Sequence, residues 1–564
     1  MKYKFSFSGN YSNSHNYTHT PEYYTKWNED GTPDKDYGSP KNSISESRGE
    51  EFTYTIDNLI TYNKTFAGHS IDALLGTSWM REYNRNMSIS TIDDLGGTDI
   101  TGFSNVDGKI SAGDSNAALL SFFARLNYDY KDRYLLSASI RRDESSKFYK
   151  DNRVGYFPSI SAGWNVHQEN WFQNRVVSKL KLRASYGELG ANFLSPYNFD
   201  AIAYGPIPYT LNGKRYVNGR SAYLKSRDLT WETAKTTDIG LELGFLNNEL
   251  TLQVDYFVKK NVDLLAQIDL NLSSGQIFEI NSSREKPYVN SASVKNTGWE
   301  FLINYRKQLT KDFNIDATFN LSTLKNEVLS LGENVQPITS GAMSSFFNDA
   351  ASITKPGEAI GSFYGYKIDG FDAEGNFIFS DTDKNGIVNA NDKVILGNPI
   401  PDFNYGLNLT MSYKDFDLTM FFQGVSGNEI FNQKKYTYYF DYSNNCVTDV
   451  LNAWSKTNHN ASIPIMKTQN TNGGNSLPSE FYIEDGSYFR CKNLQVGYNL
   501  PKSLLNKISF NKLRIYAGVQ NLFTITSYSG YDPEVSSNAL FSRGIDNASY
   551  PNARTFTFGF NASF

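Results

Sequence analysis

The feature that most constrains this 564-residue sequence is a strict alternation of apolar and polar residues over long stretches. Near its end, Phe556, Phe558, Phe560 and Ala562 occupy every second position, and Thr, Gly, Asn and Ser fill the positions between them. A period of two places the apolar residues on one face of a β-strand and the polar residues on the other. About 17 segments of roughly 8–13 residues share this pattern, so the sequence predicts an all-β fold of two-faced strands.

The composition also favours strands over helices. Aromatic residues make up 15% of the chain, with 39 Phe and 38 Tyr, and there are 42 Gly. Phe and Tyr favour strands, whereas Gly, Asn and Ser favour turns. No apolar run approaches the roughly 18 residues of a membrane-spanning helix. The net charge of −5 gives no basic surface of the kind that binds nucleic acid, so we expect no nucleic-acid partner.

The connections between the alternating segments fall into two length classes. Lys131–Arg133, Asn247–Asn248 and Lys414–Asp415 each separate two segments, which predicts tight hairpin turns. Long polar connections are expected at 189–231, 261–297, 326–363 and 426–481. Short periplasmic turns and long extracellular loops are typical of outer-membrane barrels. The sequence therefore predicts a large antiparallel transmembrane β-barrel.

In such a barrel the outward face is apolar and the inward face is wet. The predicted inward positions are polar and often charged, as at Lys181, Arg183, Glu242, Asp255 and Glu300. More than a dozen strands enclose an interior that side chains cannot fill, so we expect a channel or a plugged lumen. The polar inward positions lower the mean hydropathy of the chain to −0.49, although the outward face is apolar.

A string of soluble β-sandwich domains would also alternate apolar and polar residues. Sandwich strands are usually shorter, near 5–6 residues, and no linkers are visible between domains. Aromatic residues also gather near segment ends, as at Tyr130 and Tyr134 or Tyr413 and Phe416, where the interfacial belts of a membrane barrel lie. We therefore favour the barrel over the sandwich array.

A series of short motifs runs through the chain in a fixed order. The motifs are Arg125–Asp143, Gly155–Trp164, Lys181–Gly187, Pro401–Gly406, Glu484–Tyr488, Tyr531–Glu534 and Tyr550–Phe556. Together they resemble the SusC/RagA family of TonB-linked outer-membrane proteins, which are TonB-dependent receptors. The resemblance implies that residues 1–564 are the barrel of a receptor of the 22-stranded type. The signal peptide, the TonB-contacting segment and the plug of this family have no counterpart in the sequence, so we expect a C-terminal portion.

The function implied by this resemblance is nutrient import across the outer membrane. An oligosaccharide or peptide would be captured with a SusD-like lipoprotein and drawn inward by TonB–ExbB–ExbD acting on the plug. The expected surroundings and partners are therefore outer-membrane lipid, the lipoprotein, the TonB complex and the substrate. The alternative is a passive porin or a surface-exposed β-rich adhesion protein.

One acidic segment has the spacing of a calcium loop. Asp381, Asp383, Asn385 and Asp392 occupy positions 1, 3, 5 and 12 of an EF-hand-type loop, with a glycine at position 6. The main-chain carbonyl of Ile387 would be a further ligand, and an all-oxygen set in a flexible loop favours Ca²⁺ over Mg²⁺. An Asp replaces the usual bidentate Glu at the last position and no flanking helices are predicted, so an acidic turn is the alternative.

Aromatic side chains cluster in a predicted loop at Tyr436, Tyr438, Tyr439 and Tyr442. Aromatic faces stack on sugar rings, so substrate binding is one hypothesis for these residues. Packing within the loop or an interfacial belt is the interpretation that we favour.

The last strand ends on an aromatic residue. Phe560 and Phe564 in an alternating terminal strand resemble the signal read by the barrel-insertion machinery, and the apolar outer face of a last strand is the plain alternative. The sequence contains no nucleophile-elbow or phosphate-loop motif and no His/Cys cluster. We therefore expect no enzymatic activity, no nucleotide and no redox cofactor.

Overall fold

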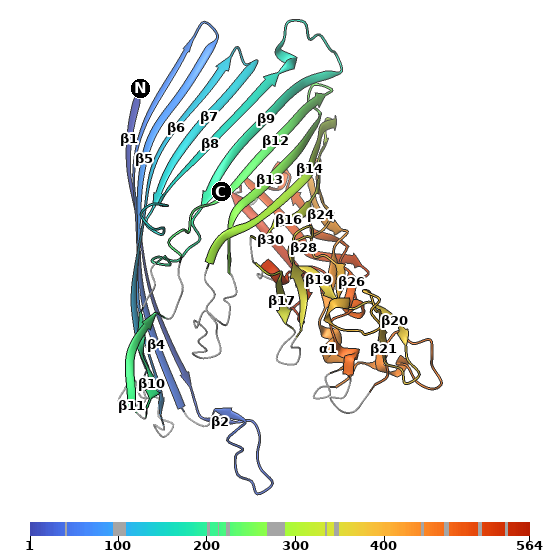
Figure 1. Cartoon of the computed structure of the whole chain (residues 1–564). Helices are drawn as coiled ribbons and strands as arrows, with labels where there is room; N and C mark the ends of the chain where they lie inside the picture. The colour runs from blue at the N-terminus through green and yellow to red at the C-terminus, as the bar shows by residue number, and fades with distance from the viewer. Residues whose placement is uncertain are drawn as a thin grey trace.

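The structure is a computed structural model. It describes residues 1–39, 42–93, 109–199, 203–212, 214–221, 226–267, 288–332, 335–342, 349–440, 445–466, 473–505, 510–535 and 540–563. One large curved sheet dominates it, with most of the irregular structure gathered at one end (Figure 1). The all-β architecture predicted from the alternation is confirmed.

The large sheet has 17 strands. They are β1 (Lys2–Thr20), β4 (Asn42–Phe66), β5 (His69–Asp93), β6 (Lys109–Tyr130), β7 (Tyr134–Ser145), β8 (Val154–Asn165), β9 (Val177–Ala191), β12 (Glu232–Phe245), β13 (Leu250–Gln267), β14 (Tyr288–Thr310), β15 (Phe313–Thr323), β16 (Lys325–Ser330), β23 (Phe403–Tyr413), β24 (Phe416–Ser426), β27 (Tyr488–Asn499), β28 (Lys512–Thr526) and β30 (Thr555–Ser563). Strands that follow one another in this sheet pair antiparallel, from β1–β4 through β9–β12 and β15–β23 to β28–β30, and β16 extends the pairing of β14.

The strands are longer than the alternation indicated. β4 and β5 have 25 residues each and β14 has 23, against the predicted 8–13. A tilted strand needs only about 9–11 residues to cross a bilayer. The excess lies on the loop side of the sheet, beyond the part of each strand that crosses the bilayer. For the same reason the predicted connection at 261–297 is wrong in length, because strands occupy its two ends.

The tight turns predicted from the sequence are confirmed. Lys131–Arg133 joins β6 to β7, Asn247 and Asn248 lie between β12 and β13, and Lys414 and Asp415 lie between β23 and β24. Several of these residues have positive φ, for example 55° at Lys131 and 57° at Asn247. The turns lie at one end of the sheet and the long connections at the other (Figure 1). This asymmetry is that of a membrane barrel, with the turns on the periplasmic side.

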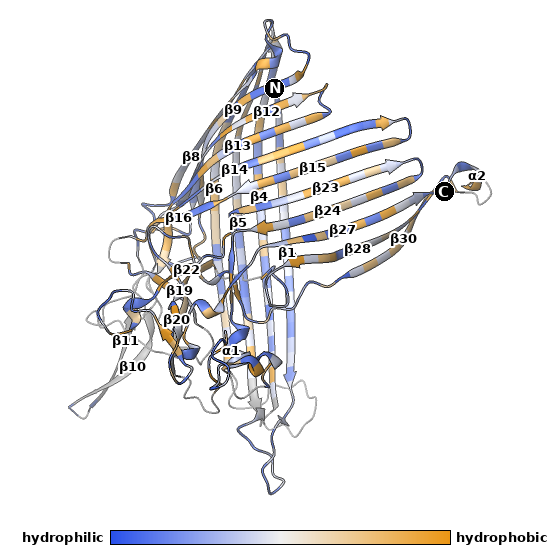
Figure 2. Ribbon diagram, turned by 90° about the vertical axis from the view of Figure 1, so that its right-hand side faces the viewer, coloured by the Kyte–Doolittle hydropathy of each residue, from blue (hydrophilic) through white to orange (hydrophobic). Residues whose placement is uncertain are grey.

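The strand register carries the alternation across the sheet (Figure 2). On one face, Leu182, Leu241, Val254, Phe301 and Leu321 are successive cross-strand partners. On the other face the corresponding run is Arg183, Gly240, Asp255, Glu300 and Ser322. Paired residues share a face, so one surface is apolar and the other polar. In a bilayer the apolar surface faces lipid and the polar surface faces the lumen.

Aromatic rings form a belt at the turn end of the sheet. Tyr130 stacks on Tyr134, Tyr134 on Trp164, and His69 lies 4.6 Å from the Tyr130 ring. The predicted gathering of aromatics at segment ends is therefore confirmed. A second group lies around Trp79, which packs edge-on against another ring of the outward face. The stretch from His69 to Trp79 rises roughly 24 Å at a 45° tilt, which matches an apolar band about 25 Å tall.

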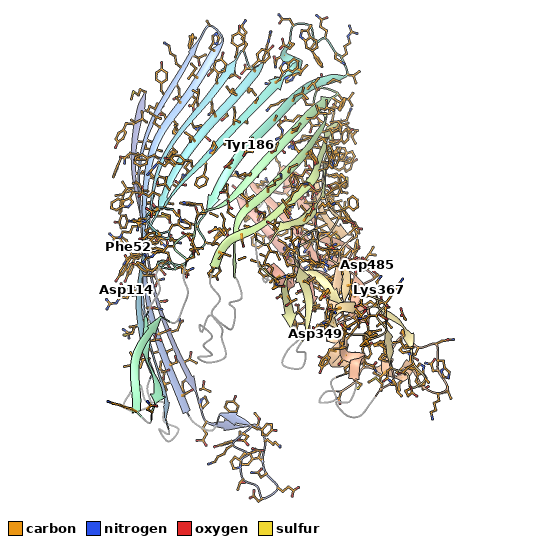
Figure 3. The ribbon with its side chains drawn as sticks, viewed as in Figure 1. Phe52, Asp114, Tyr186, Asp349, Lys367 and Asp485 are labelled. Carbon is orange, nitrogen blue, oxygen red and sulfur yellow. The ribbon has the colours of Figure 1, made fainter. Side chains whose placement is uncertain are left out.

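The long connections fold together into a compact unit, the loop module, made of the described parts of 335–402, 427–487 and 527–554 (Figure 1). Its elements are β17 (Ile338–Ala342), β18 (Ala350–Thr354), β19 (Ser362–Gly365), β20 (Ile368–Phe371), β21 (Phe377–Phe379), β22 (Val394–Gly397), β25 (Glu429–Asn432), α1 (Lys434–Tyr439), β26 (Ile483–Asp485) and β29 (Ile545–Asp546). Its buried core comprises Ala351, Phe363, Phe377, Phe431, Phe440 and Tyr482. Asp349, Lys367 and Asp485 lie in this unit (Figure 3).

The remaining elements are small. They are the hairpins β2 (Tyr23–Tyr24) with β3 (Gly38–Ser39) and β10 (Ala203–Leu211) with β11 (Lys214–Ser221), and the helix α2 (Lys502–Leu505). Within the described ranges, no helix has the length and apolarity of a membrane span. Both cysteines are free: Cys446 is exposed and Cys491 is buried.

Candidate functional site

An ion-pair network covers part of the polar, lumen-facing surface, and it centres on Arg183 of β9. Arg183 donates to Asp255 Oδ1 at 2.5 Å, and its guanidinium lies 3.6 Å from Asp238 and 3.5 Å from Glu242. Asp255 is buried although it carries a charge. Burying a carboxylate is costly unless it is paired. Arg183 supplies this pairing from β9, reaching Asp255 of β13 across Gly240 of β12.

Lysines extend the network along β9. The Nζ of Lys179 lies 2.7 Å from Glu242 Oε2, and the Nζ of Lys181 lies 3.7 Å from Glu242 Oε1. The predicted inward charges at Lys181, Arg183, Glu242 and Asp255 are therefore brought together on one face. Within this network three cations balance three carboxylates, and Glu300, the cross-strand partner of Asp255, adds a further carboxylate to the same face.

Two shallow depressions lie in the lumen-facing surface, each of about 500 Å³. The first is lined by polar side chains that include Asp72, Asn127, Lys181, Arg183 and Asp238. The second is lined by Gln253, Asp255, Glu300, Asn320, Asn404 and Gln423, among others. Their side chains offer donors and acceptors to a hydrated solute or to a polypeptide segment. Neither lining contains a His or Cys that could act as a nucleophile or metal ligand.

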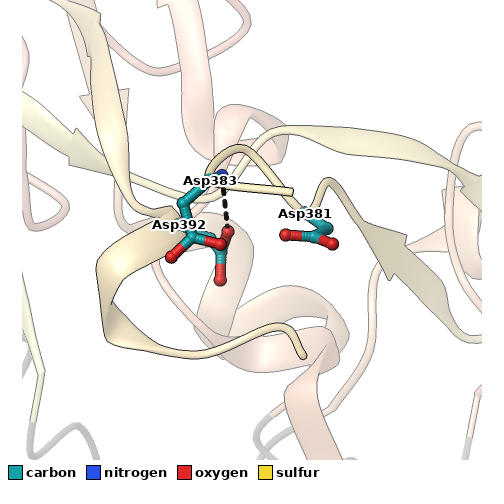
Figure 4. Close-up of side chains that lie close together, drawn as sticks. All are labelled: Asp381, Asp383 and Asp392. Atoms are coloured by element: carbon teal, nitrogen blue, oxygen red, sulfur yellow. Dashed lines mark hydrogen bonds between the residues drawn. The ribbon is translucent and has the colours of Figure 1, made fainter. Parts of the chain in front are cut away.

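The acidic segment of the loop module forms a tight loop. One oxygen from each of Asp381, Asp383 and Asp392 lies within 4.8 Å of the others (Figure 4). The Asp381 carboxylate accepts hydrogen bonds from the backbone N–H groups of Asn385 and Gly386. The three carboxylates predicted from the spacing are thus adjacent in space, which is the donor set that a hard cation prefers.

The other two predicted ligands are engaged within the loop. The side-chain amide of Asn385 donates to Asp383, and its oxygen accepts from the backbone N–H of Ile387. The Ile387 carbonyl accepts from the side chain of Asn389. Each of these two oxygens accepts one hydrogen bond, so each keeps a second lone pair that could coordinate a cation.

Asp392 has a structural role in this arrangement. It is fully buried, and its carboxylate accepts from the backbone N–H groups of Asn389 and Thr382 and from that of Asp383, the bond drawn in Figure 4. The bond from Asn389 is the main reason that the pKa of Asp392 lies below its ordinary range. Asp392 thus closes the loop through main-chain contacts, and it stays ionised without a cation.

The predicted aromatic cluster lies on and after α1. Tyr436 and Tyr439 pack against the core of the loop module. Tyr438 is half-buried, and its hydroxyl donates to the Tyr531 hydroxyl at 3.4 Å. This bond raises the pKa of Tyr438 to about 12. Tyr442 lies outside the described residues. Much of the surface of Tyr436 and Tyr439 is covered, and substrate contact by this cluster stays a prediction.

At the end of the chain, the side chains of the last strand are strongly exposed on the apolar face. Phe558 is 81% exposed and Phe560 is 71% exposed, as expected of lipid-facing residues. Phe564 lies outside the described residues, so its part in an insertion signal stays a prediction.

Two buried charge clusters were not identified from the sequence. Arg490 of β27 contacts Asp532 and Glu534, which lie in the connection between β28 and β30. Lys434 of α1 pairs with Asp546 at 3.2 Å. The motif Tyr531–Glu534, which was used above only as a mark of the family, contains Asp532 and Glu534. The Arg490 cluster joins the loop module to the sheet, and the pair of Lys434 and Asp546 lies within the loop module.

Comparison with known proteins gives a consistent result. A family profile described as TonB dependent receptor-like, beta-barrel, matches residues 1–522. TonB-dependent receptor P3 of Formosa agariphila is 35% identical over 539 residues, covering 90% of this chain and 52% of that protein. TonB-dependent receptor SusC of Bacteroides thetaiotaomicron is 32% identical over 471 residues, covering 79% of this chain and 44% of that protein. The chain thus spans about half the length of the curated relatives it matches.

The fold comparison agrees with the profile. The structure of the RagAB peptide transporter superposes with a TM-score of 0.81 at 23% sequence identity, covering 100% of this chain and 60% of that chain. The RagAB peptide importer in its closed-closed state gives the same TM-score at 24% identity, covering 100% of this chain and 60% of that chain. The large curved sheet is therefore the wall of a barrel of this type.

Proposed function

The chain belongs to the TonB-dependent receptor-like β-barrel family, and from this membership we propose that it is the barrel portion of an energised nutrient importer of the SusC/RagA type. Barrels of this type lie in the outer membrane, and so does this chain. The observation that carries the proposal is the division of one continuous sheet into an apolar outward face and a charged, hydrated inward face.

The proposal extends to the rest of the protein and to its partners. Because the chain spans about half of its relatives, we propose that a plug and a TonB-contacting segment belong to the same protein. A SusD-like lipoprotein would cover the loop module, and TonB–ExbB–ExbD would supply the work of moving the plug. The transported class would be an oligosaccharide or a peptide, and no catalytic step is included.

Uptake by cells tests this function against the passive porin. The full-length gene would be deleted and restored in its host, and uptake of labelled oligosaccharides and peptides measured with and without a protonophore. An importer loses uptake when the proton gradient collapses or TonB is removed. Uptake that persists under both treatments would support the porin and contradict the proposal.

Two local roles accompany the transport function. We propose that the loop of Asp381, Asp383 and Asp392 binds Ca²⁺ and stiffens the loop module, since three carboxylates already lie together there. We also propose that Tyr438, which is not among the α1 tyrosines that pack against the core of the loop module, contributes to substrate contact. Support for the second role comes only from the chemistry of aromatic faces.

A further inference from the structure

An apolar groove of about 490 Å³ runs over the outward face of β1, β4, β5, β6, β7 and β8. Its lining combines large side chains with smaller residues. The large ones include Tyr3, Ile60, Leu75, Phe122, Ile140 and Tyr156, and the smaller ones include Asn58, Thr77 and Ala124. These residues share one face, because Ile60, Leu75, Ala124 and Ile140 are successive cross-strand partners. The groove is therefore open to the hydrocarbon of the bilayer.

One strongly polar side chain lines this groove, Arg142 of β7. Its guanidinium lies over the Phe122 ring at 5.8 Å and donates to Glu144 Oε2 at 3.0 Å. An arginine on the lipid face costs about 2–4 kcal/mol at the bilayer midplane and about 0–1 kcal/mol near the interfaces. Its placement here therefore indicates an interfacial position.

The height of Arg142 in the membrane follows from the strand register. Arg142 pairs with Phe122, which pairs with Thr77 of β5, two residues from Trp79. Trp79 belongs to the aromatic group on the loop side of the apolar band, opposite the belt at His69. The long loops mark the extracellular side. Arg142 thus lies at the headgroup level of the outer leaflet, with the groove running below it into the hydrocarbon.

We propose that this groove is a specific lipid site, in which one acyl chain lies against the large apolar side chains of its lining and a phosphate group of the lipid A class binds Arg142. A guanidinium has five N–H donors in a planar fork that matches phosphate. The guanidinium donates to Glu144 and to the Tyr156 hydroxyl, and its other N–H groups remain for a phosphate. The site joins a shaped apolar surface to a cation at the depth where outer-leaflet phosphates lie.

Neighbouring charges on the same outward face determine whether a substitution should strengthen or weaken phosphate binding. Glu144 is the carboxylate nearest to Arg142, and it repels a phosphate while holding the guanidinium. Arg81 lies on the outward face of β5, two residues beyond Trp79, and it is exposed. On β9 and β12, Glu188 and Lys235 lie 3.6 Å apart and offset one another. Neutralising Glu144 should therefore strengthen phosphate binding, whereas neutralising Arg142 should weaken it.

The test measures lipid binding to the full-length protein, purified in detergent and stripped of bound lipid. Native mass spectrometry would follow titration with bisphosphorylated lipid A, with lipid A lacking both phosphates, and with phosphatidylglycerol. The variants are Arg142→Gln and Glu144→Gln. The matched control is Arg125→Gln, which removes the same charge from the opposite, lumen-facing side of β6, where Arg125 lies 3.7 Å from Asp72. Heat-modifiable gel migration would show that each variant is folded.

We expect Arg142→Gln to weaken lipid A binding about tenfold or more, as loss of hydrogen bonds to a charged group does. Glu144→Gln should strengthen binding, Arg125→Gln should leave it unchanged, and removal of the phosphates should reproduce the loss seen with Arg142→Gln. Equal effects of the Arg142 and Arg125 substitutions would overturn the site. Binding of the phosphate-free lipid or of phosphatidylglycerol as tight as that of lipid A would overturn the assigned headgroup.

Discussion

Arg490 NH2 lies 2.6 Å from Asp532 Oδ1, and the two side chains are 3% and 8% exposed. The pair joins strand β27 of the barrel wall to the connection between β28 and β30. Asp532 also accepts from the backbone N–H of Asn552, and Arg490 also contacts Glu534 at 2.5 Å. One buried guanidinium therefore anchors a long extracellular connection to the rigid sheet.

Replacing Arg490 by Met should release this connection. Removal of one partner from a buried ion pair leaves an uncompensated charge and typically costs about 3–5 kcal/mol. We expect the segment 527–554 to become sensitive to external protease while the barrel keeps its heat-modifiable migration. The control is Arg306→Met, whose side chain is 74% exposed beside Asp316 and which should change protease sensitivity little. Equal protection of 527–554 in both variants would contradict an anchoring role.

The same anchor predicts a pH dependence. Burial raises the pKa of Asp532, but hydrogen bonds from Arg490 and from the backbone N–H groups of Glu534 and Asn552 outweigh it, so the net pKa is lowered from 3.8. A carboxyl group with a lowered folded-state pKa stabilises the fold above its ordinary pKa and ceases to do so as the pH falls through the folded value. Protease protection of 527–554 should therefore be constant near neutrality and fall below about pH 4. Asp532→Asn should remove the stabilisation by ionised Asp532 at neutral pH. If protease protection of 527–554 in that variant still fell below about pH 4 as in the unmodified protein, Asp532 would not be the group responsible.

A second buried pair should behave as a coupled unit. Lys434 and Asp546 are 4% and 2% exposed, and Asp546 also accepts from the Tyr528 hydroxyl. Burial is the main cause that raises the pKa of Tyr528, and the hydrogen bond to Asp546 is the next largest cause. The Tyr528 hydroxyl therefore stays protonated and acts as a donor. Lys434→Met and Asp546→Asn should each lower the thermal midpoint of the loop module. The double variant should be less destabilised than the sum of the two, because it leaves no unpaired charge. Additive effects would show that the two residues act independently.

Opposite faces of one strand should respond differently to the same charge. Leu409 of β23 pairs with Ala317 and Met420 on the apolar face, and Asn408 next to it pairs with Thr318 and Phe421 on the polar face. Leu409→Lys should cost about 2–4 kcal/mol if the residue lies near the bilayer midplane, whereas Asn408→Lys should be tolerated. Insertion into lipid vesicles, scored by heat-modifiable migration, measures the difference. Equal insertion of the two variants would contradict the assignment of the faces.

Calcium should stabilise the loop module through the acidic loop. We expect millimolar Ca²⁺ to raise the thermal midpoint of this unit, and Asp381→Asn to abolish the increase. Glu374→Gln removes a carboxylate from a nearby exposed turn and should leave the increase intact. Asp392→Asn should destabilise the loop with or without Ca²⁺, because its carboxylate holds three backbone N–H groups. No response to Ca²⁺ in the unmodified protein would favour the acidic turn.

The barrel wall was predictable because lipid and water impose a local pattern. Each residue of β30 faces one or the other, so Phe556, Phe558 and Phe560 could be assigned to the outer face without knowledge of their neighbours. The turn at Lys131–Arg133 was visible for the same local reason. The outer halves of β4 and β5 were missed, since they extend beyond the bilayer, where lipid no longer imposes the alternation.

The loop module could not be predicted, because its contacts join segments far apart in the chain. Arg490 lies on strand β27 and Asp532 lies in the connection between β28 and β30, and nothing near either residue in sequence indicates the other. The acidic loop was found because its carboxylates fall within twelve consecutive residues. The burial of Asp392 was not, since it depends on the backbone N–H groups that surround it. Tyr436 and Tyr439 were noticed as a cluster, but only the fold shows that they pack inward.

The extension of β4 and β5 beyond the bilayer has a mechanical consequence. From Trp79 to Asp93 the ribbon climbs roughly 30 Å above the headgroups at a 45° tilt. Its stiffness comes from main-chain hydrogen bonds to neighbouring strands rather than from loop packing. A solute that diffuses toward the cell therefore reaches the rigid outer ends of β4 and β5 well before it reaches the lipid surface. A molecule that contacts this rim therefore meets a surface whose position relative to the barrel wall is fixed by hydrogen bonds.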